Sequence, residues 1–414
     1  MTVALLKYYE RNQQKSQTKF MKTGYSIRTW RMRLVCPEPI WLDRTEEYFQ
    51  NVVEFYYHLL RQHEELWNSS LFDIQRSLEL LTLTGRDGRQ PTNPLPMGKV
   101  PVYLRRAAIN KASATVKSTQ ELQSGFPEKL EAKVTFFKGM YSDLTDRSIC
   151  LKLWNGEKWI WTDCNLKGRP FPQDGQLMSP TLVKEGRRYL LNIPVKQENS
   201  DARTAKERMA EGTNLCSVRF TNTDTFAVCC ILDEQGKQLA VHNCRGGDAY
   251  RHRCKLLETR IQKSRPNTVG DNSPQPNRKY YMHLKNLSEH YAHQVSREIL
   301  NFCKENQAGI IVLPDYDQNF TRMAMVKSGN FSPLHLSSKI RTNLQYKAWA
   351  EGILVLETRT DGLKDKCAIC GGKVRRKGNE FLCENGHQGN RFLNDARNLG
   401  RKCQDSFFRG SRTK

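Results

Sequence analysis

Two different periodicities divide the first part of the chain. Residues 23–37 alternate between apolar and polar positions and stop at Pro37, which predicts a β-strand. After this strand, apolar residues recur at steps of three and four with charged residues between them, which is typical of amphipathic helices. A loop rich in Gly and Pro interrupts the helical pattern at 85–101. We expect helices over 42–66, 71–83 and 102–119.

The pattern changes near residue 128, where β-branched and aromatic residues are interspersed with Gly and Asn turns. Residues 128–197 therefore predict a small β-barrel or sandwich. Within them, the stretch "WNGEKW" predicts a tight hairpin with Asn155-Gly156 as its turn. We expect the strand over 23–36 to join this sheet across the helical insert.

A third pattern follows the polar stretch 197–214, which we expect to be a linker. Apolar strands within 215–244 are succeeded by a basic helix over 248–265. A long amphipathic helix from Tyr280 to about residue 304 then leads into the buried strand 309–314. The order strand, strand, long helix, buried strand is typical of an α/β domain. The apolar face of the long helix consists of Leu284, Leu287, Tyr291, Val295 and Ile299.

The chain is strongly basic. Its 414 residues include 66 Lys and Arg against 43 Asp and Glu, which gives a formal charge of +23. Because the excess runs along the whole chain, we expect a polyanionic partner, and nucleic acid is favoured over an anionic membrane surface. No apolar run reaches the about 18 residues that a membrane span needs, and no signal peptide is expected.

Two helices carry the basic residues that we expect to contact phosphate groups. The alternative for each of them is a solvated helix face. In the helix over 102–119 the candidates are Arg105, Arg106, Lys111 and Lys117. In the helix over 248–265 they are Arg251, Arg253 and Lys255, and the same helix also contains Arg260, Lys263 and Arg265.

Three of the thirteen cysteines form a cluster with a histidine. The other ten are scattered, as is typical of reduced thiols in a cytosol. Cys367-x2-Cys370 is followed after twelve residues by Cys383-x3-His387. Four soft ligands at this spacing predict a tetrahedral structural zinc ion, with no open coordination position. The alternative is a three-cysteine site that a group other than His387 completes.

The order of these elements resembles the TnpB family, the transposon-encoded relatives of the compact type V CRISPR effectors. The motifs that carry the resemblance are "VYLRRAAINKA", "RRYLLNIPVK", and the cysteine cluster followed by "NRFLNDARNLGRK". The resemblance implies a multidomain α/β protein: a β-barrel wedge domain with a helical recognition insert, then an RNase H-like (RuvC) domain with a zinc ribbon insert. The expected segments are 1–40 and 128–200 for the wedge, 41–127 for the recognition lobe, 201–365 for the RuvC-like domain, 366–390 for the zinc ribbon, and 391–414 for the closing helix and a basic tail.

Active members of that family cut DNA with three carboxylates that hold two magnesium ions. This sequence departs from the family pattern at all three places. Phe220 or Val218 stands at the first acid position, depending on the register, Pro314 at the second and Phe392 at the third. Such side chains cannot bind magnesium. We therefore expect zinc as the only metal, no Mg²⁺ and a catalytic centre that has been lost.

An alternative reading keeps the enzyme active through acids close to the lost positions. Asp224, Asp315 and Asp395 lie near them in the sequence. A shift from Pro314 to its neighbour turns the side chain to the other face of a strand. On a helix, by contrast, a residue three positions after Phe392 partly shares its face. Strand alternation therefore weighs against a shifted site.

The resemblance implies a guide RNA and a double-stranded DNA target beside a short sequence motif as partners. Without cleavage, the protein would be an RNA-guided DNA-binding protein that represses transcription or recruits a transcription-related protein, in a prokaryotic cytoplasm in association with the nucleoid. The alternatives are an active RNA-guided endonuclease that uses the shifted acids, and a plain RNA-binding zinc protein without a DNA target.

Overall fold

The computed structural model describes residues 24–264, 277–316 and 331–408, except for positions 86, 123, 173, 200 and 202. Arg265 and the basic tail after residue 408 lie outside the described residues. The chain divides into two compact units. We call residues 27–197 the N-terminal unit, and residues 198–414 together with 1–26 the C-terminal unit.

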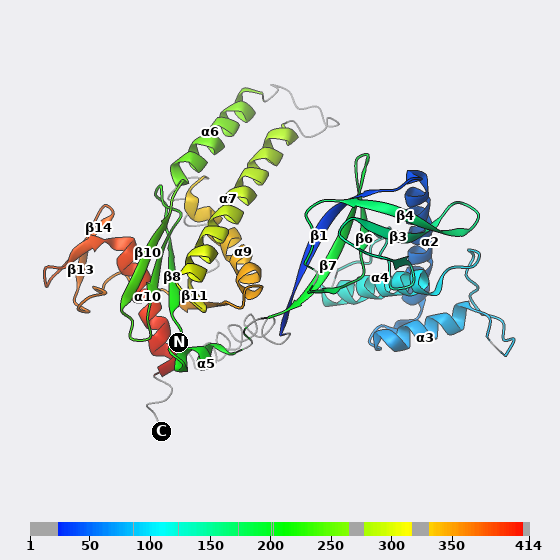
Figure 1. Cartoon of the computed structure of the whole chain (residues 1–414), viewed down its shortest axis with the longest axis horizontal. Helices are drawn as coiled ribbons and strands as arrows, with labels where there is room; N and C mark the ends of the chain where they lie inside the picture. Colours follow the sequence, from blue (N-terminus) through cyan, green and yellow to red (C-terminus); the bar gives the residue numbers. More distant parts are fainter. Residues whose placement is uncertain are drawn as a thin grey trace. The chain divides into compact units, whose positions relative to one another are not determined.

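A curled sheet of seven strands organises the N-terminal unit (Figure 1). Its order is β2-β3-β4-β1-β7-β5, and β6 also pairs with β7. As predicted, β1 joins this sheet across the helical insert, because it pairs antiparallel with β4. The strands are β1 (Tyr25–Val35), β2 (Tyr141–Ser142), β3 (Ser148–Trp154), β4 (Trp159–Lys167), β5 (Gln176–Leu177), β6 (Thr181–Glu185) and β7 (Arg188–Glu198).

The predicted hairpin between β3 and β4 is present, with a longer loop than the sequence indicated. Trp154 pairs with Trp159, so the loop contains four residues and not two. The Asn155 side chain accepts hydrogen bonds from the backbone N–H groups of Glu157 and Lys158, both at 2.8 Å. Gly156 has a positive φ of 114°, which a residue with a side chain rarely adopts. Asn155 therefore organises the loop through its side chain.

The helical insert between β1 and β2 buries the apolar faces that the periodicity predicted. In α2, Phe49, Val52, Val53 and Tyr56 are fully buried, and Ser70 caps the N-terminus of α3 by accepting from the Asp73 N–H. The helices are α2 (Pro39–Gln62), the short 3₁₀ helix η1 (Glu64–Leu66), α3 (Leu71–Thr82) and α4 (Val102–Glu121).

A second sheet, of five strands, forms the centre of the C-terminal unit. Its order is β10-β9-β8-β11-β12. β9 is antiparallel to both of its neighbours, whereas β11 is parallel to β8 and β12. The strands are β8 (Leu215–Phe220), β9 (Ala227–Leu232), β10 (Gln238–Cys244), β11 (Ile310–Asp315) and β12 (Leu354–Arg359).

Helices cover both faces of this sheet, and each face has its own hydrophobic core. On one face, residues of α7 and α9 pack against Cys216, Val218 and Phe220 of β8. On the other face, α10 packs on Leu215 and its neighbours. A Cβ atom added at Gly400 would lie 2.5 Å from the Leu232 side chain, so the glycine permits the close approach of α10 to the sheet.

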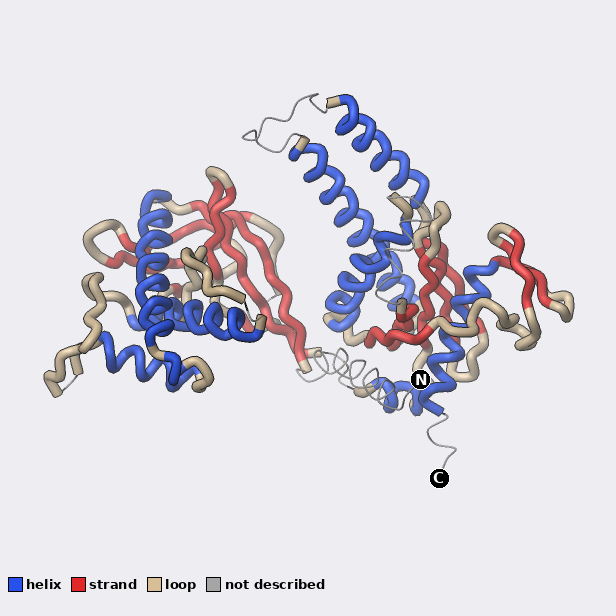
Figure 2. Tube along the Cα trace, turned by 180° about the vertical axis from the view of Figure 1, so that it is seen from behind, coloured by secondary structure: helices blue, strands red, loops and turns tan. Residues whose placement is uncertain are grey.

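The α6–α7 pair extends beyond the end of the five-stranded sheet, as Figures 1 and 2 show from opposite sides. The predicted apolar face of α7 is confirmed: Tyr291, Val295 and Ile299 are buried, and the two leucines nearer its N-terminus are half-buried against the same core. The helices of the unit are α5 (Ala205–Ala210), α6 (Gly247–Lys263), α7 (Arg278–Glu305), η2 (Pro333–Leu336), α9 (Ser337–Trp349) and α10 (Arg391–Phe408).

A small antiparallel sheet precedes α10 and contains the cysteine cluster. It consists of β13 (Val374–Lys377), β14 (Glu380–Cys383) and β15 (Gln388–Asn390). β15 ends directly before α10 begins, so the position of this sheet is tied to the helix that covers the larger one.

The expectation of a linker over 197–214 is wrong, because the stretch contains the helix α5. Thr204 and Glu207 form a reciprocal capping box at its N-terminus. Arg208 is fully buried, and its guanidinium donates to the backbone oxygens of Gly309 and Gly352 at 2.7 and 2.6 Å. The stretch therefore combines exposed polar residues, such as Lys206 and Glu207, with one buried arginine that links α5 to the segments before β11 and β12.

The structure also corrects the expectation for Arg105, which is buried between α3 and α4. Its guanidinium donates to Glu79 at 3.2 and 3.0 Å and to the Val100 backbone oxygen at 3.3 Å. The neighbouring Arg106 also reaches Glu79, at 3.4 Å, but it is exposed. Arg105 is thus unavailable to phosphate groups and stabilises the packing of the helices.

Substitution of these two arginines should separate the structural role from the surface role. We expect Arg105→Ala to lower the free energy of unfolding of the N-terminal unit by about 2 kcal/mol, because it removes the charge-assisted hydrogen bonds between a buried guanidinium and the partly buried Glu79 carboxylate. Arg106→Ala should lower it by less than about 1 kcal/mol. Six of the seven tryptophans lie in this unit, so tryptophan fluorescence during urea denaturation reports its unfolding. Equal losses for the two variants would contradict the assignment.

Candidate functional site

One small pocket of the C-terminal unit brings together residues from β8, β11 and α10. Arg219, Pro314 and Asp395 line it, with Leu363 and Leu399 among the other residues of its wall. Asp395 is 2% exposed, and its Oδ2 lies 3.3 Å from Nε of Arg219. The pocket therefore places the guanidinium group of Arg219, on β8, beside the carboxylate of Asp395, on α10.

A second arginine completes the environment of Asp395. Arg376, on β13, donates to the two carboxylate oxygens at 2.5 and 3.3 Å, and to the Lys364 backbone oxygen at 2.8 Å. Arg219 also donates to the Tyr316 hydroxyl at 2.8 Å. We call Asp395, Arg219 and Arg376 the ion triad. Two guanidinium groups thus compensate the single buried carboxylate.

The structure does not place Val218 or Phe220 beside Pro314. Successive residues of a strand point to opposite faces, and the side chains of Val218 and Phe220 lie in the core with α7. Pro314 and Asp395 lie on the α10 face, where Arg219 is the residue of β8 that meets them. Arg219, and not Val218 or Phe220, is therefore the residue of β8 that lies beside Pro314 and Asp395.

Phe392 and Asp224 lie in a different cavity from Pro314. They line a cleft of about 890 Å³ at the end of β8 and the start of α10, together with Arg245, Arg251 and Arg391. The Asp224 carboxylate accepts a hydrogen bond from the backbone N–H of Asp248 at 3.1 Å, in the first turn of α6. Its observed role is thus to cap a helix N-terminus.

The three acids of the alternative active site do not gather into a cation site. Asp315 lies close to Glu357, and burial first and then the charge of Asp315 raise the pKa of Glu357. Asp224 is at the start of α6, and Asp395 belongs to the ion triad. Within the described ranges, the groups that could hold a metal ion are two clusters, and neither includes Asp224, Asp315 or Asp395.

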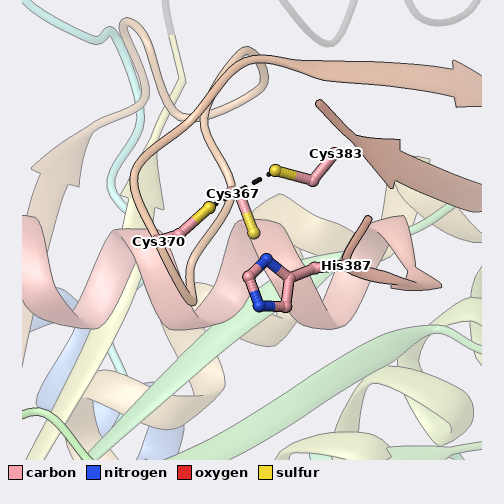
Figure 3. A group of neighbouring side chains, drawn as sticks. All are labelled: Cys367, Cys370, Cys383 and His387. Atoms are coloured by element: carbon pink, nitrogen blue, oxygen red, sulfur yellow. Dashed lines mark hydrogen bonds between the residues drawn. The ribbon is translucent and has the colours of Figure 1, made fainter. Parts of the chain in front are cut away.

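The first of these clusters consists of the predicted ligands Cys367, Cys370, Cys383 and His387. Their ligand atoms all lie within 4.8 Å of one another, and Figure 3 shows a nitrogen of the His387 ring turned towards the Cys367 sulfur. Nδ1 of His387 is buried without a hydrogen-bond partner, as expected for an atom that binds a metal. The donor set and its geometry therefore fit a tetrahedral transition metal such as zinc.

Two turns of similar design present the cysteine sulfurs. Backbone N–H groups of Ile369 and Asn385 donate to the sulfurs of Cys367 and Cys383, each at 3.4 Å. The Asn385 side chain donates to the Cys370 sulfur at 3.3 Å, and this bond and the Gly372 backbone lower the pKa of the Cys370 thiol to about 6. The turns thus stabilise the negative charge that a metal-binding sulfur carries.

Side-chain amides attach this cluster to α10. Asn394 accepts from the Ala368 N–H and donates to the Lys366 oxygen, both at 2.8 Å. Asn398 donates to the same Lys366 oxygen at 2.8 Å and to the Leu363 oxygen at 3.0 Å. The "LNDARN" stretch therefore holds the metal-binding segment on the helix. Sequence reasoning did not find these roles, or those of Arg219 and Arg376, although the two asparagines flank "DAR" in a motif that it singled out.

The remaining basic candidates differ in their availability. On α6, Arg253 and Lys255 are exposed, whereas Arg251 is engaged by the Asp248 carboxylate and, at 3.3 Å, by the Asn222 backbone oxygen. On α4, Lys111 is exposed, and Lys117 donates to the Ser69 oxygen at 3.0 Å. Arg253 and Lys255 are thus the predicted residues of α6 that are freest to meet a phosphate group.

Comparison with family models and with curated proteins assigns only part of the chain. The Aq_aa04 family model matches residues 26–155, which is less than half of the chain. A search of curated proteins gives no match. No described helix is long and apolar enough to cross a membrane.

Two solved structures are similar over nearly their whole length. A Cas12f1–sgRNA–target DNA complex has a TM-score of 0.51 and 12% identity over 91% of this chain and 99% of that one. The mini-RNA-guided endonuclease CRISPR-Cas phi3 has a TM-score of 0.52 and 9% identity over 95% and 97%. Alicyclobacillus acidoterrestris C2c1 in complex with single-guide RNA, at 9% identity over 95% and 70%, has a TM-score of 0.48. The chain therefore has the fold of compact type V effectors, as its sequence resemblance predicted.

Loss of one cysteine ligand should remove the metal from the four-residue cluster. We expect Cys383→Ser to hold one zinc equivalent fewer per chain than the wild type in elemental analysis, and to be cleaved by protease within 366–390, because the metal links the two turns. Cys403→Ser is the matched control, since Cys403 is a buried cysteine of α10 outside the cluster. Unchanged zinc content in Cys383→Ser would exclude this site.

The exposed cations of α6 should contribute to nucleic-acid affinity through counterion release. We expect Arg253→Ala with Lys255→Ala to weaken RNA or DNA binding and to reduce the slope of log K against log salt by about one per lost phosphate contact. Lys206→Ala with Lys237→Ala removes the same charge from exposed positions outside α6. Equal changes in slope for both double variants would assign the effect to net charge and not to α6.

Proposed function

We propose that this protein binds a guide RNA and a complementary DNA target and does not cut the DNA. The fold supports the first part, because the similar structures are described as complexes with guide RNA and target DNA, or as an RNA-guided endonuclease. The formal charge of +23 supports it as well, because protein contacts to an RNA–DNA duplex are mostly contacts to its backbone.

The assignment of the C-terminal unit as a RuvC-like domain is part of this proposal. The sheet order β10-β9-β8-β11-β12, with β9 antiparallel and α10 on one face, agrees with the expected RNase H-like arrangement. On this assignment, the β-sheet and helices of the N-terminal unit are the wedge and recognition lobe, and residues 366–390 are a zinc ribbon inserted before the closing helix.

The ion triad is the observation that carries the loss of cleavage. Metal-dependent phosphodiester cleavage needs carboxylates that converge and stay available to two divalent cations. Here Arg219 and Pro314 occupy the strand positions beside Asp395, and two guanidinium groups bind its carboxylate. A divalent cation at this point would have to displace Arg376 and would still face the charge of Arg219. The centre therefore favours a closed ion pair over magnesium.

An effector without cleavage remains bound where its guide directs it. Exchange of DNA pairing for RNA–DNA pairing is nearly balanced in free energy, so protein contacts to the backbone can make the complex persistent. A persistent complex at a promoter excludes polymerase. Repression of transcription is thus the proposed outcome, with recruitment of a transcription-related protein as a second use of the same complex.

Cleavage and binding can be measured on the same material. The RNA that copurifies is sequenced, and a plasmid that carries its complement is incubated with the protein in Mg²⁺. We expect a guide-dependent gel shift and intact supercoiled plasmid, because two guanidinium groups already engage the Asp395 carboxylate. Binding that ignores the guide sequence would favour a plain RNA-binding zinc protein.

Asp315→Asn tests the shifted acids without disturbing the ion triad. If the wild type nicks its target and Asp315→Asn does not, the protein is an active endonuclease and the proposed loss of cleavage is wrong. If neither nicks and both bind, the result agrees with the proposal.

A further inference from the structure

A second group of metal-ligand side chains lies in the C-terminal unit, away from the four-residue cysteine cluster. His242 and Cys244 are on β10, and Glu298 is on α7. One ligand atom from each lies within 4.8 Å of the others, and His242 Nε2 is 2.6 Å from Glu298 Oε1. Residues two apart on a strand point to the same face, and the edge strand therefore presents both donors to the helix.

We propose that His242, Cys244 and Glu298 form a second binding site for a borderline-soft divalent metal ion such as zinc. This combination of imidazole, thiolate and carboxylate donors is one that zinc accepts. With metal–ligand distances of about 2.0–2.3 Å, neighbouring donor atoms of a tetrahedral site lie roughly 3–4 Å apart. Small side-chain adjustments therefore suffice to enclose an ion.

The surroundings provide both access and a fourth donor. The side chains of His242 and Glu298 are about one-third exposed, so an ion can reach them from solvent. Cys244 is fully buried, and its thiol interacts with that of Cys229 on the neighbouring strand β9. Either Cys229 or a water molecule would complete the coordination shell.

The bound metal would connect two elements that otherwise meet through side-chain packing and the His242–Glu298 hydrogen bond. β10 is the edge of the five-stranded sheet, and α7 is the long helix whose N-terminal part extends beyond it. Coordination by residues of both would fix the base of the α6–α7 pair to the sheet edge. The test of this site measures metal content and does not depend on the proposed function.

Metal content of the full-length chain tests the site. The protein is saturated with Zn²⁺, passed through a desalting column and subjected to elemental analysis. We expect two zinc equivalents per chain for the wild type, one for Cys244→Ser and one for Cys383→Ser. Cys254→Ser should retain two, because Cys254 is an equally buried cysteine of α6 outside the group.

Two milder variants and a spectroscopic readout guard against loss of fold. His242→Asn and Glu298→Gln leave the buried thiol in place and should each bind one equivalent. In Co²⁺-loaded Cys383→Ser, thiolate-to-cobalt absorbance should remain, and it should disappear when Cys244→Ser is added. A single equivalent in the wild type that Cys383→Ser removes entirely would overturn the proposal and leave a His–Glu ion pair above a buried thiol. Metal loss from Cys254→Ser equal to that from Cys244→Ser would also overturn it.

Discussion

The carboxylate of Asp395 is buried at the start of α10, and the arrangement of the C-terminal unit depends on how its charge is compensated. An isolated buried carboxylate would cost several kcal/mol. Arg219 brings compensation from the central strand β8, and Arg376 brings it from the small sheet that carries the cysteine cluster. One charge therefore joins the large sheet, the closing helix and the metal-binding segment. β13 pairs with β14, and Asn394 and Asn398 fix the segment before β13 to α10.

The same charge compensation is the basis of the proposed function, in which the protein binds nucleic acid and does not cleave DNA. A hydrolytic metal centre keeps acidic groups together and open to cations, at a cost in electrostatic repulsion. The ion triad contains one carboxylate and two guanidinium groups, so the charge of its acid is neutralised within the protein. Positive charge that remains uncompensated lies on the surface, for example at Arg253 and Lys255 of α6. This distribution of charge agrees with a protein that binds a nucleic acid and does not cleave it.

Buried arginines show how composition can mislead. Arg105 and Arg208 both belong to stretches whose polar character suggested contact with solvent or nucleic acid. Each is instead buried, against Glu79 in one case and against backbone oxygens of two later segments in the other. These partners lie 26 and more than 100 residues away in the sequence, and no local pattern predicts them. Sequence reasoning therefore placed the helix that contains Arg105 but missed the one that contains Arg208, and it found the role of neither residue.

The sequence by itself determined the features that local periodicity and spacing encode. The three- and four-residue repeats of α2 and α7, the strand before Pro37, the presence of a hairpin after Trp154 and the cysteine cluster with its histidine all follow from short-range physical chemistry. Only the tertiary structure decided which face of β8 meets Pro314. Successive side chains of β8 point to opposite faces of the sheet. The helix α10 packs on the face that holds Arg219, whereas Val218 and Phe220 point to the other face. That choice depends on contacts between residues more than 170 positions apart, since Arg219 meets Asp395, and such contacts form only when the sheet and its closing helix come together.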